Sequence, residues 1–217
     1  VEHYIEHVQP IASRFLIEQA DLGVGEATVR NEMRALEEAG YLTHPHTSAG
    51  RIPTEQGYRY YVEQSLEKES SLDGLKKELI TMITAAEHPK EALKSIAKYL
   101  AEQSGNAVMI AFDEYSVYYT GISQLFAQPE FRDYSHTVQV SSMFDHCEEK
   151  IGEVLEKISS ENEFEILIGS ENPLGSASST IVLPLPNNQS LLLIGPLRMN
   201  YKQNIQHIRA LHSALHS

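Results

Sequence analysis

Hydrophobic side chains recur at helical spacing through residues 1–104. The clearest stripe is Val29, Met33 and Leu36, which are four and three residues apart and therefore lie on one face of a helix over 26–39. Gly40 follows as the residue expected to end that helix. The same spacing predicts further helices over 2–7, from Pro10 through Leu16, and over 54–66, 71–86 and 89–103.

Beyond residue 104 the apolar residues gather in short runs that are typical of strands. These runs predict strands over 108–112, 116–119, 165–168, 180–183 and 191–194. Residues 184–188 predict a hairpin turn between the last two strands, and residues 138–160 and 200–216 predict helices. A helical front with one short hairpin therefore precedes a mixed rear, and the fold class is α+β.

The order of elements in the front predicts a helix-turn-helix followed by a wing. Residues 21–25 form the expected turn, 41–43 a short extended segment, and 44–53 a loop rich in Pro, Gly, Ser and Thr. We therefore expect a winged-helix DNA-binding domain over 1–66, a helical connector over 67–104 and a smaller α+β domain over 105–217.

The face of helix 26–39 opposite the hydrophobic stripe is a candidate reader of DNA bases. Asn can bond adenine in a bidentate manner, Arg can bond guanine or phosphate, and an Ala methyl can touch thymine. The pattern fits a merely solvated helix face equally well. The side chains on this face are Ala27, Asn31 and Arg34, with Thr28 and Arg30 beside them.

The loop over 44–53 has the composition of a DNA-contacting wing. Prolines at both ends stiffen its stems, and small residues at its tip allow close approach to a groove. Arg51 supplies a cation for the minor groove. A metal at His44 and His46 is disfavoured because no Cys lies nearby and no Glu is placed to act as a third ligand. The candidate DNA contacts here are His44, His46, Thr47, Ser48, Gly50, Arg51 and, in the next helix, Arg59.

The net charge of the whole chain argues against a nucleic-acid-binding protein, but the charge of this loop does not. The net charge is −13, from 30 acidic and 17 basic residues, whereas a DNA-binding protein usually presents a basic face. Residues 39–54, however, contain no acidic residue and include Arg51. An acidic body can therefore carry a neutral-to-basic tip.

The remaining composition excludes several other classes of protein. A single cysteine, Cys147, excludes a disulfide framework and a cysteine zinc cluster and favours a reducing cytoplasm. No apolar run approaches the length of a membrane span, and no secretory leader is visible, so we expect a cytoplasmic protein without a membrane partner.

Candidate enzyme sites in the rear are weak, and we expect no enzyme, cofactor or metal. Asp113 and Glu114 lie on an expected turn, and the adjacent His146 and Cys147 would point about 100° apart on a helix. His212 and His216 have metal-like spacing but no third ligand.

A long stretch of the front closely resembles the heat-inducible transcription repressor HrcA family of bacteria. The resemblance rests on ATVRNEM at 27–33, Leu36–Glu37, GYL at 40–42, PHTSAGRIPT at 45–54 and GYRYYV at 57–62. Weaker matches lie at 129–131, 168–172 and 194–201.

The resemblance implies a dimeric winged-helix repressor of heat-shock genes. Such repressors bind double-stranded DNA at an inverted repeat, the CIRCE operator, ahead of chaperone operons, and the chaperonin GroEL keeps them active. The resemblance also implies that residues 105–217 form a reduced GAF-like domain. An alternative stays open, in which the chain is a ligand-sensing winged-helix regulator of genes unrelated to chaperones. That function would need a roomy, partly polar pocket in residues 105–217.

Two features depart from the family pattern. Gly25 and Glu26 stand where the family has serines at the start of the reading helix, and Glu26 would repel nearby phosphates. Between Ser104 and Gly121 the chain has only sixteen residues, where the family carries a longer stretch with an inserted dimerising domain. We therefore expect a short member of the family that lacks this insert.

Overall fold

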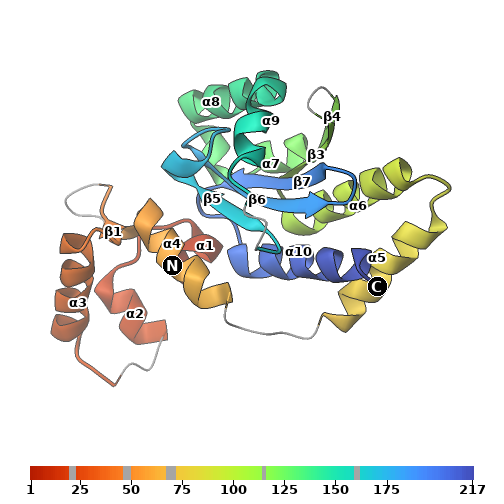
Figure 1. The fold of residues 1–217 in the computed structure, drawn as a ribbon. Coiled ribbons are helices and arrows are strands. Elements are labelled where there is room, and N and C mark those ends of the chain that lie inside the picture. The colour runs from red at the N-terminus through yellow and green to blue at the C-terminus, as the bar shows by residue number, and fades with distance from the viewer. Residues whose placement is uncertain (20–22, 46–49, 67–71, 114–115, 159–161) are drawn as a thin grey trace. The chain divides into compact units, whose positions relative to one another are not determined.

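The computed structural model describes residues 1–19, 23–45, 50–66, 72–113, 116–158 and 162–217 (Figure 1). The chain forms two compact units, Val1–Glu67 and Lys68–Ser217. The segment expected to be a helical connector, 67–104, contributes two helices to the second unit. Within the described residues, no helix is both long and apolar enough to cross a membrane.

The first unit contains four helices and one short hairpin among its described residues. They are α1 (Glu2–His7), α2 (Ser13–Gln19), α3 (Glu26–Glu38), the antiparallel strands β1 (Leu42–Thr43) and β2 (Ile52–Pro53), and α4 (Glu55–Leu66).

The helix predicted to start at Pro10 instead begins at Ser13. Ile11 is extended and pairs with Arg51, since each backbone N–H donates to the other residue's carbonyl at 2.9 Å. Pro10 has no N–H to contribute to either a helix or a strand. The consequence is that the segment before α2 lies alongside the second stem of the hairpin.

Helix α3 forms as predicted, although one member of its hydrophobic stripe is exposed. Val29 and Met33 are 6% and 5% exposed, whereas Leu36 is 45% exposed. The helix ends in a Schellman motif: Gly40, at a φ of +83°, donates its N–H to the Glu37 carbonyl, and the Tyr41 N–H donates to that of Leu36. The glycine is required there because a left-handed backbone is costly for other residues.

Thr54 joins the end of α3 to the start of α4. Its hydroxyl donates to the Gly40 carbonyl at 2.6 Å and accepts from the Gly57 N–H at 3.1 Å. One side chain therefore satisfies a carbonyl after α3 and a free N–H in the first turn of α4. The hairpin lies between these two helices in the sequence, so its base is held on both sides.

The second unit is built on a five-stranded antiparallel sheet in the order β4-β3-β7-β6-β5. The strands are β3 (Ala107–Asp113), β4 (Ser116–Thr120), β5 (Glu165–Ile168), β6 (Ser178–Leu185) and β7 (Gln189–Pro196). α6 (Pro89–Ser104) and α10 (Tyr201–Leu215) cover one face, with α5 (Asp73–Ala85) packed against both of them, and α7 (Ile122–Phe126), α8 (Tyr134–Asp145) and α9 (Cys147–Leu155) cover the other (Figure 1).

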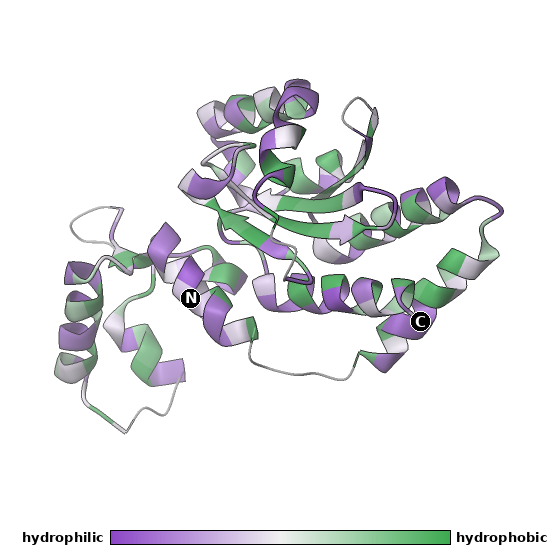
Figure 2. Cartoon of the chain, in the orientation of Figure 1, coloured by the Kyte–Doolittle hydropathy of each residue, from purple (hydrophilic) through white to green (hydrophobic). Residues whose placement is uncertain are grey.

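Helices on both faces explain why the central strands are mostly hydrophobic, apart from the buried polar residues 178–180 at the start of β6 (Figure 2). Met109 and Leu192 face α7–α9, whereas their neighbours Ile110 and Leu191 face the opposite way and are also fully buried. The mixed α+β class predicted from the sequence is confirmed.

Two predictions for the second unit differ in detail. The single helix expected over 138–160 is two helices, α8 and α9, which meet at His146. The hairpin turn is tighter than expected, because Leu185 pairs with Gln189 and only 186–188 remain, with Asn187 and Asn188 both at a φ of +60°. A short 3₁₀ helix, Pro129–Arg132, precedes α8.

Candidate nucleic-acid interface

The outer face of α3 presents the side chains that the sequence assigned to it. The inward positions of the helix are taken by Val29 and Met33, which leaves the polar residues to solvent. Ser13 of α2 donates to Glu26 at 3.4 Å and links the two helices at the start of α3. The exposed candidates on this face are Ala27, Thr28, Arg30, Asn31 and Arg34.

Both arginines on this face have a carboxylate partner on the same helix. Arg30 donates to Glu26 at 2.5 Å, and Arg34 lies 3.6 Å from Glu38. Exposed pairs four residues apart contribute little to stability, so either guanidinium can exchange its partner for a phosphate. The Glu26 charge, expected to repel DNA, is therefore partly neutralised by Arg30.

The hairpin is described only at its stems. His46, Thr47 and Ser48 lie outside the described residues, so their candidate roles stay predictions. His44 is exposed at the end of the first stem. Gly50 begins the second stem in close contact with the chain before α2, where a Cβ would lie 2.5 Å from the Ile11 carbonyl carbon. This contact explains the need for glycine at position 50 without any reference to DNA.

One carboxylate on α3 contacts both stems of the hairpin. Arg51 donates from Nε to Glu37 Oε2 at 2.9 Å, and His44 Nδ1 bonds to Glu37 Oε1. Burial raises the pKa of Glu37, but the hydrogen bonds from Arg51 and His44 outweigh it and leave that pKa below its ordinary value. The sequence analysis missed this contact. Its only signal was that Glu37 and Glu38 are the last acidic residues before the acid-free stretch 39–54.

Every arginine of the first unit is paired with a glutamate. Besides the three arginines above, Arg59 lies 3.6 Å from Glu55, and Arg14 donates to Glu18 at 2.8 Å. The first unit has no lysine within residues 1–66, so its cations are arginines and histidines alone. The cationic surface expected of a DNA-binding domain is thus internally compensated.

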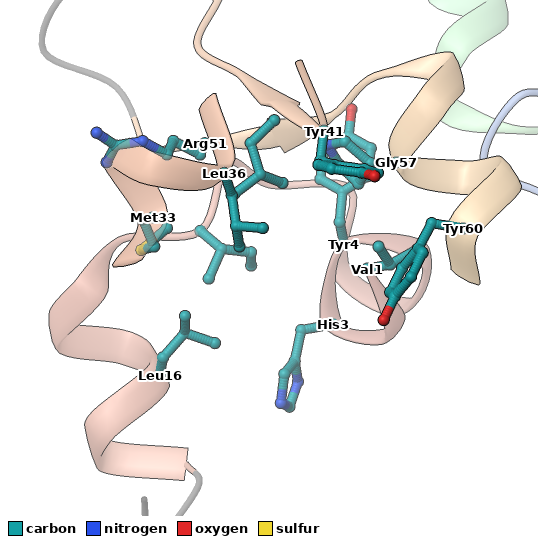
Figure 3. Close-up of a pocket in the computed structure, with 13 residues that line it drawn as sticks. Val1, His3, Tyr4, Leu16, Met33, Leu36, Tyr41, Arg51, Gly57 and Tyr60 are labelled. Carbon is teal, nitrogen blue, oxygen red and sulfur yellow. The ribbon is translucent and has the colours of Figure 1, made fainter. Parts of the chain in front are cut away.

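An apolar cavity of about 490 Å³ lies inside the first unit, between its helices and the hairpin (Figure 3). Its walls include Leu16, Met33 and Leu36. Figure 3 shows the guanidinium of Arg51 directed away from the cavity rather than into it. Arg51 therefore lines the cavity while its guanidinium is bound to Glu37.

The other clusters weighed from the sequence do not assemble a reactive site among the described residues. Cys147 is buried, and that burial raises the pKa of its thiol, which disfavours a nucleophile. His216 bonds through Nδ1 to the His212 carbonyl, and His212 lies 3.9 Å from Glu163. Glu114 lies outside the described residues.

A group that the sequence analysis overlooked lies on α1. His3, Glu6 and His7 place their potential ligand atoms within 4.8 Å of one another. The two imidazoles stack at 6.2 Å, and His3 meets the edge of Phe15 at 5.2 Å. His7 and Glu6 are mostly exposed, and these ring contacts account for the arrangement as packing between α1 and α2.

Comparison with solved structures supports the fold. The chain is similar to a hypothetical protein whose crystal structure was determined at 2.2 Å, with a TM-score of 0.71 and 17% sequence identity. The similarity covers 99% of this chain and 93% of that one.

Two curated relatives share a higher identity over part of the chain, and both carry the name heat-inducible transcription repressor HrcA. The protein of Bifidobacterium longum (strain NCC 2705) is 40% identical over 111 residues, which are 51% of this chain and 30% of the relative. The protein of Roseiflexus castenholzii is 56% identical over 68 residues, which are 31% of this chain and 19% of the relative. The matched regions thus span about a third or less of the relatives' own length.

A family model described as the HrcA protein C-terminal domain matches residues 57–205. This range begins in α4, includes all five strands of the sheet and ends within α10. Because the match extends over more than half of the 217 residues, the chain belongs to the HrcA family.

Proposed function

We propose that this chain is a DNA-binding transcriptional repressor of heat-shock genes, acting on an inverted-repeat operator of the CIRCE type ahead of chaperone operons. The observation that carries the proposal is the exposed polar face of α3 beside the hairpin β1–β2, in a chain of the HrcA family. The names of the relatives supply the regulatory role.

In this proposal the first unit is a winged helix. α2 and α3 form the helix-turn-helix pair, and the hairpin is the wing. A recognition helix presents the side chains near its N-terminus to base edges in the major groove. Ala27 and Asn31 occupy that part of α3, and Arg34 follows one turn later. Arg51 and His44 then lie on the wing, where minor-groove or phosphate contacts are made.

The charge pattern defines how such a protein binds. The net charge of −13 opposes DNA at long range, and the arginines of the first unit are already paired. Binding through Arg30 and Arg34 on the outer face of α3 therefore requires their carboxylate partners to be exchanged for phosphates at short range. Phosphate contacts of this kind weaken as salt rises. We expect tight binding only at a site that fits α3 and the hairpin together, and a steep loss of affinity with salt.

An inverted repeat requires two reading helices, so the active form is a homodimer. The half-sites are separated by about 34 Å, or a multiple of it. The second unit, a reduced GAF-like domain, is the part available for dimerisation and for contact with the chaperonin GroEL. Its antiparallel sheet with helices on both faces supports the GAF-like fold.

No observation favours the ligand-sensing alternative over the repressor. The space between the sheet and α7–α9 is filled by apolar side chains such as Met109, Leu125 and Phe144. The cavity described above belongs to the first unit rather than to residues 105–217.

The proposal is tested by fluorescence anisotropy with two labelled duplexes of equal length and composition. One contains a CIRCE-type inverted repeat, and in the other both half-sites are scrambled. We expect the intact repeat to bind about 10³-fold more tightly or better at physiological salt, as specific DNA-binding proteins do. Equal affinity for the two duplexes would contradict the proposal.

A further inference from the structure

The carboxylate of Glu37 connects three parts of the first unit. Glu37 lies in the last turn of α3, His44 directly follows β1, and Arg51 directly precedes β2. Its two oxygens contact the two hairpin residues separately, Oε1 with His44 and Oε2 with Arg51. The side chain thus joins the helix that would read DNA to both stems of the wing.

This contact differs in its burial from the arginine pairs on the outer face of α3. The side chains of Arg51 and Glu37 are 21% and 24% exposed, whereas those of Arg30 and Arg34 are 64% and 68% exposed. A partly shielded pair that also makes a hydrogen bond is screened less by salt than an exposed one. The Arg51–Glu37 contact therefore persists under conditions in which the pairs on the outer face of α3 exchange.

The backbone of Arg51 is held as firmly as its side chain. Its N–H and carbonyl both pair with Ile11, so the position of its Cα is fixed before the side chain is considered. A guanidinium carries five N–H donors, and the bond to Glu37 uses the one on Nε. The donors on the two Nη atoms lie at the far end of the fork, where bidentate contact with phosphate is made.

From this geometry we propose that Glu37 is a positioning residue for DNA binding, which orients Arg51 and His44 of the wing relative to α3. The inference rests on the proposed function. Glu37 brings a negative charge to the interface and cancels that of Arg51, so it does not strengthen long-range attraction. Its contribution is orientation: an arginine already held in place loses less conformational freedom when it binds.

The orienting role and the charge of Glu37 predict opposite changes in operator affinity when the carboxylate is removed. In Glu37→Gln a negative charge near DNA is lost, which by itself strengthens binding to any sequence. Loss of orientation weakens binding to the operator. Glu32→Gln is the matched control, because Glu32 is an exposed residue of the same helix on the opposite flank of its buried stripe.

The experiment measures the affinity of each variant for the inverted-repeat and scrambled duplexes. We expect Glu32→Gln to leave the ratio of the two affinities unchanged. We expect Glu37→Gln to lower that ratio about tenfold and to weaken operator binding although a negative charge is gone. An unchanged ratio in Glu37→Gln, or tighter operator binding like that of Glu32→Gln, would overturn the inference.

A double-mutant cycle shows whether Glu37 acts through the wing. In the background of Arg51→Ala with His44→Gln, Glu37→Gln should no longer weaken operator binding, because nothing remains to be oriented. The same tenfold loss in that background would overturn the positioning role. Glu37→Asp, which keeps the charge but shortens the side chain, should fall between wild type and Glu37→Gln.

A measurement without DNA separates this inference from the proposed function. The Nε–H proton of Arg51 should give a protected NMR signal in the wild-type protein, and Glu37→Gln should expose it to exchange with water. A protected signal in a protein that shows no preference for the inverted repeat would overturn the proposed function and, with it, the positioning role. A specific binder with an unprotected Arg51 signal would overturn the positioning role alone.

Discussion

Gly57 lies directly against the backbone of Tyr41, so that a Cβ at position 57 would be 2.2 Å from the Tyr41 carbonyl oxygen. Gly57 is in the first turn of α4, and Tyr41 precedes β1. The Tyr41 carbonyl also accepts the N–H of Thr54 at 3.1 Å. The base of the hairpin β1–β2 is therefore packed against α4 without room for a side chain, which fixes how the hairpin leaves the end of α3.

This contact predicts that Gly57→Ala destabilises the first unit by about 1–3 kcal/mol, because a methyl group must displace backbone atoms. The control is Gly74→Ala in α5, where nothing lies within 4 Å of the new Cβ. That substitution should stabilise the protein by about 0.5–1 kcal/mol, since alanine favours a helix over glycine. Urea denaturation followed by circular dichroism measures both. A Gly57→Ala protein as stable as wild type would show that this packing is loose.

The reading helix gives a prediction about base discrimination. Asn31→Ala and Arg34→Ala should each lose about 1–3 kcal/mol of discrimination at one base pair of the operator. Binding to a panel of operators with single base changes measures this. If both variants keep the full sequence preference of the wild type, α3 is a solvated face and another element reads the bases.

The wing gives a prediction about salt. Arg51→Ala should weaken operator binding and reduce the salt dependence by about one phosphate contact, because Arg51 is the only Lys or Arg between Tyr41 and Thr54. The measurement is operator affinity at several salt concentrations, with Arg14→Ala as the control, since Arg14 lies on α2 and pairs with Glu18. An identical salt slope in Arg51→Ala and wild type would place the wing away from the DNA.

The second unit gives a prediction about pH. His207 on α10 is 7% exposed, and burial holds its pKa below the ordinary value of 6.5. The unfolded chain therefore binds a proton more readily than the folded one, and stability is full above pH 6.5 and declines as the pH falls below it. His207→Leu should reduce this decline, whereas His88→Leu, at an exposed position, should not. Thermal melts between pH 5 and 8 measure the effect, and equal slopes for wild type and His207→Leu would contradict it.

The inverted repeat gives a prediction about oligomeric state. The chain should form a dimer at micromolar concentration, because two reading helices must be held about one DNA turn apart or a multiple of it. Light scattering on the free protein and on its DNA complex decides the question. A strict monomer in both states would be incompatible with recognition of an inverted repeat in the manner of the family.

Periodic patterns allowed much of the fold to be predicted. Val29 and Met33 mark the buried face of α3, and the uninterrupted apolar run over 108–112 marks a central strand covered on both faces. Leu36 was assigned to the core because spacing alone does not show where neighbouring helices stop covering a face. The break between α8 and α9 was missed because both halves have helical residues and no Gly or Pro separates them.

The candidate site was predicted only in part, for a different reason. The exposed residues of α3 follow from the position of its buried face. The pairing of Arg51 with Glu37 joins residues 14 positions apart, and it depends on how the hairpin folds back toward α3. No local pattern carries that information. The charge count over 39–54 therefore described a free cation where the folded chain has a paired one.

The central claim is tested most directly by selecting binding sites for the wild-type protein from a random pool of double-stranded DNA and sequencing the enriched molecules. This measurement assumes no operator in advance. The account predicts enrichment of an inverted repeat whose half-sites lie on one side of the helix, about 34 Å apart or a multiple of it, with two chains bound to each duplex. Enrichment of no common sequence, or of a single site bound by one chain, would contradict it.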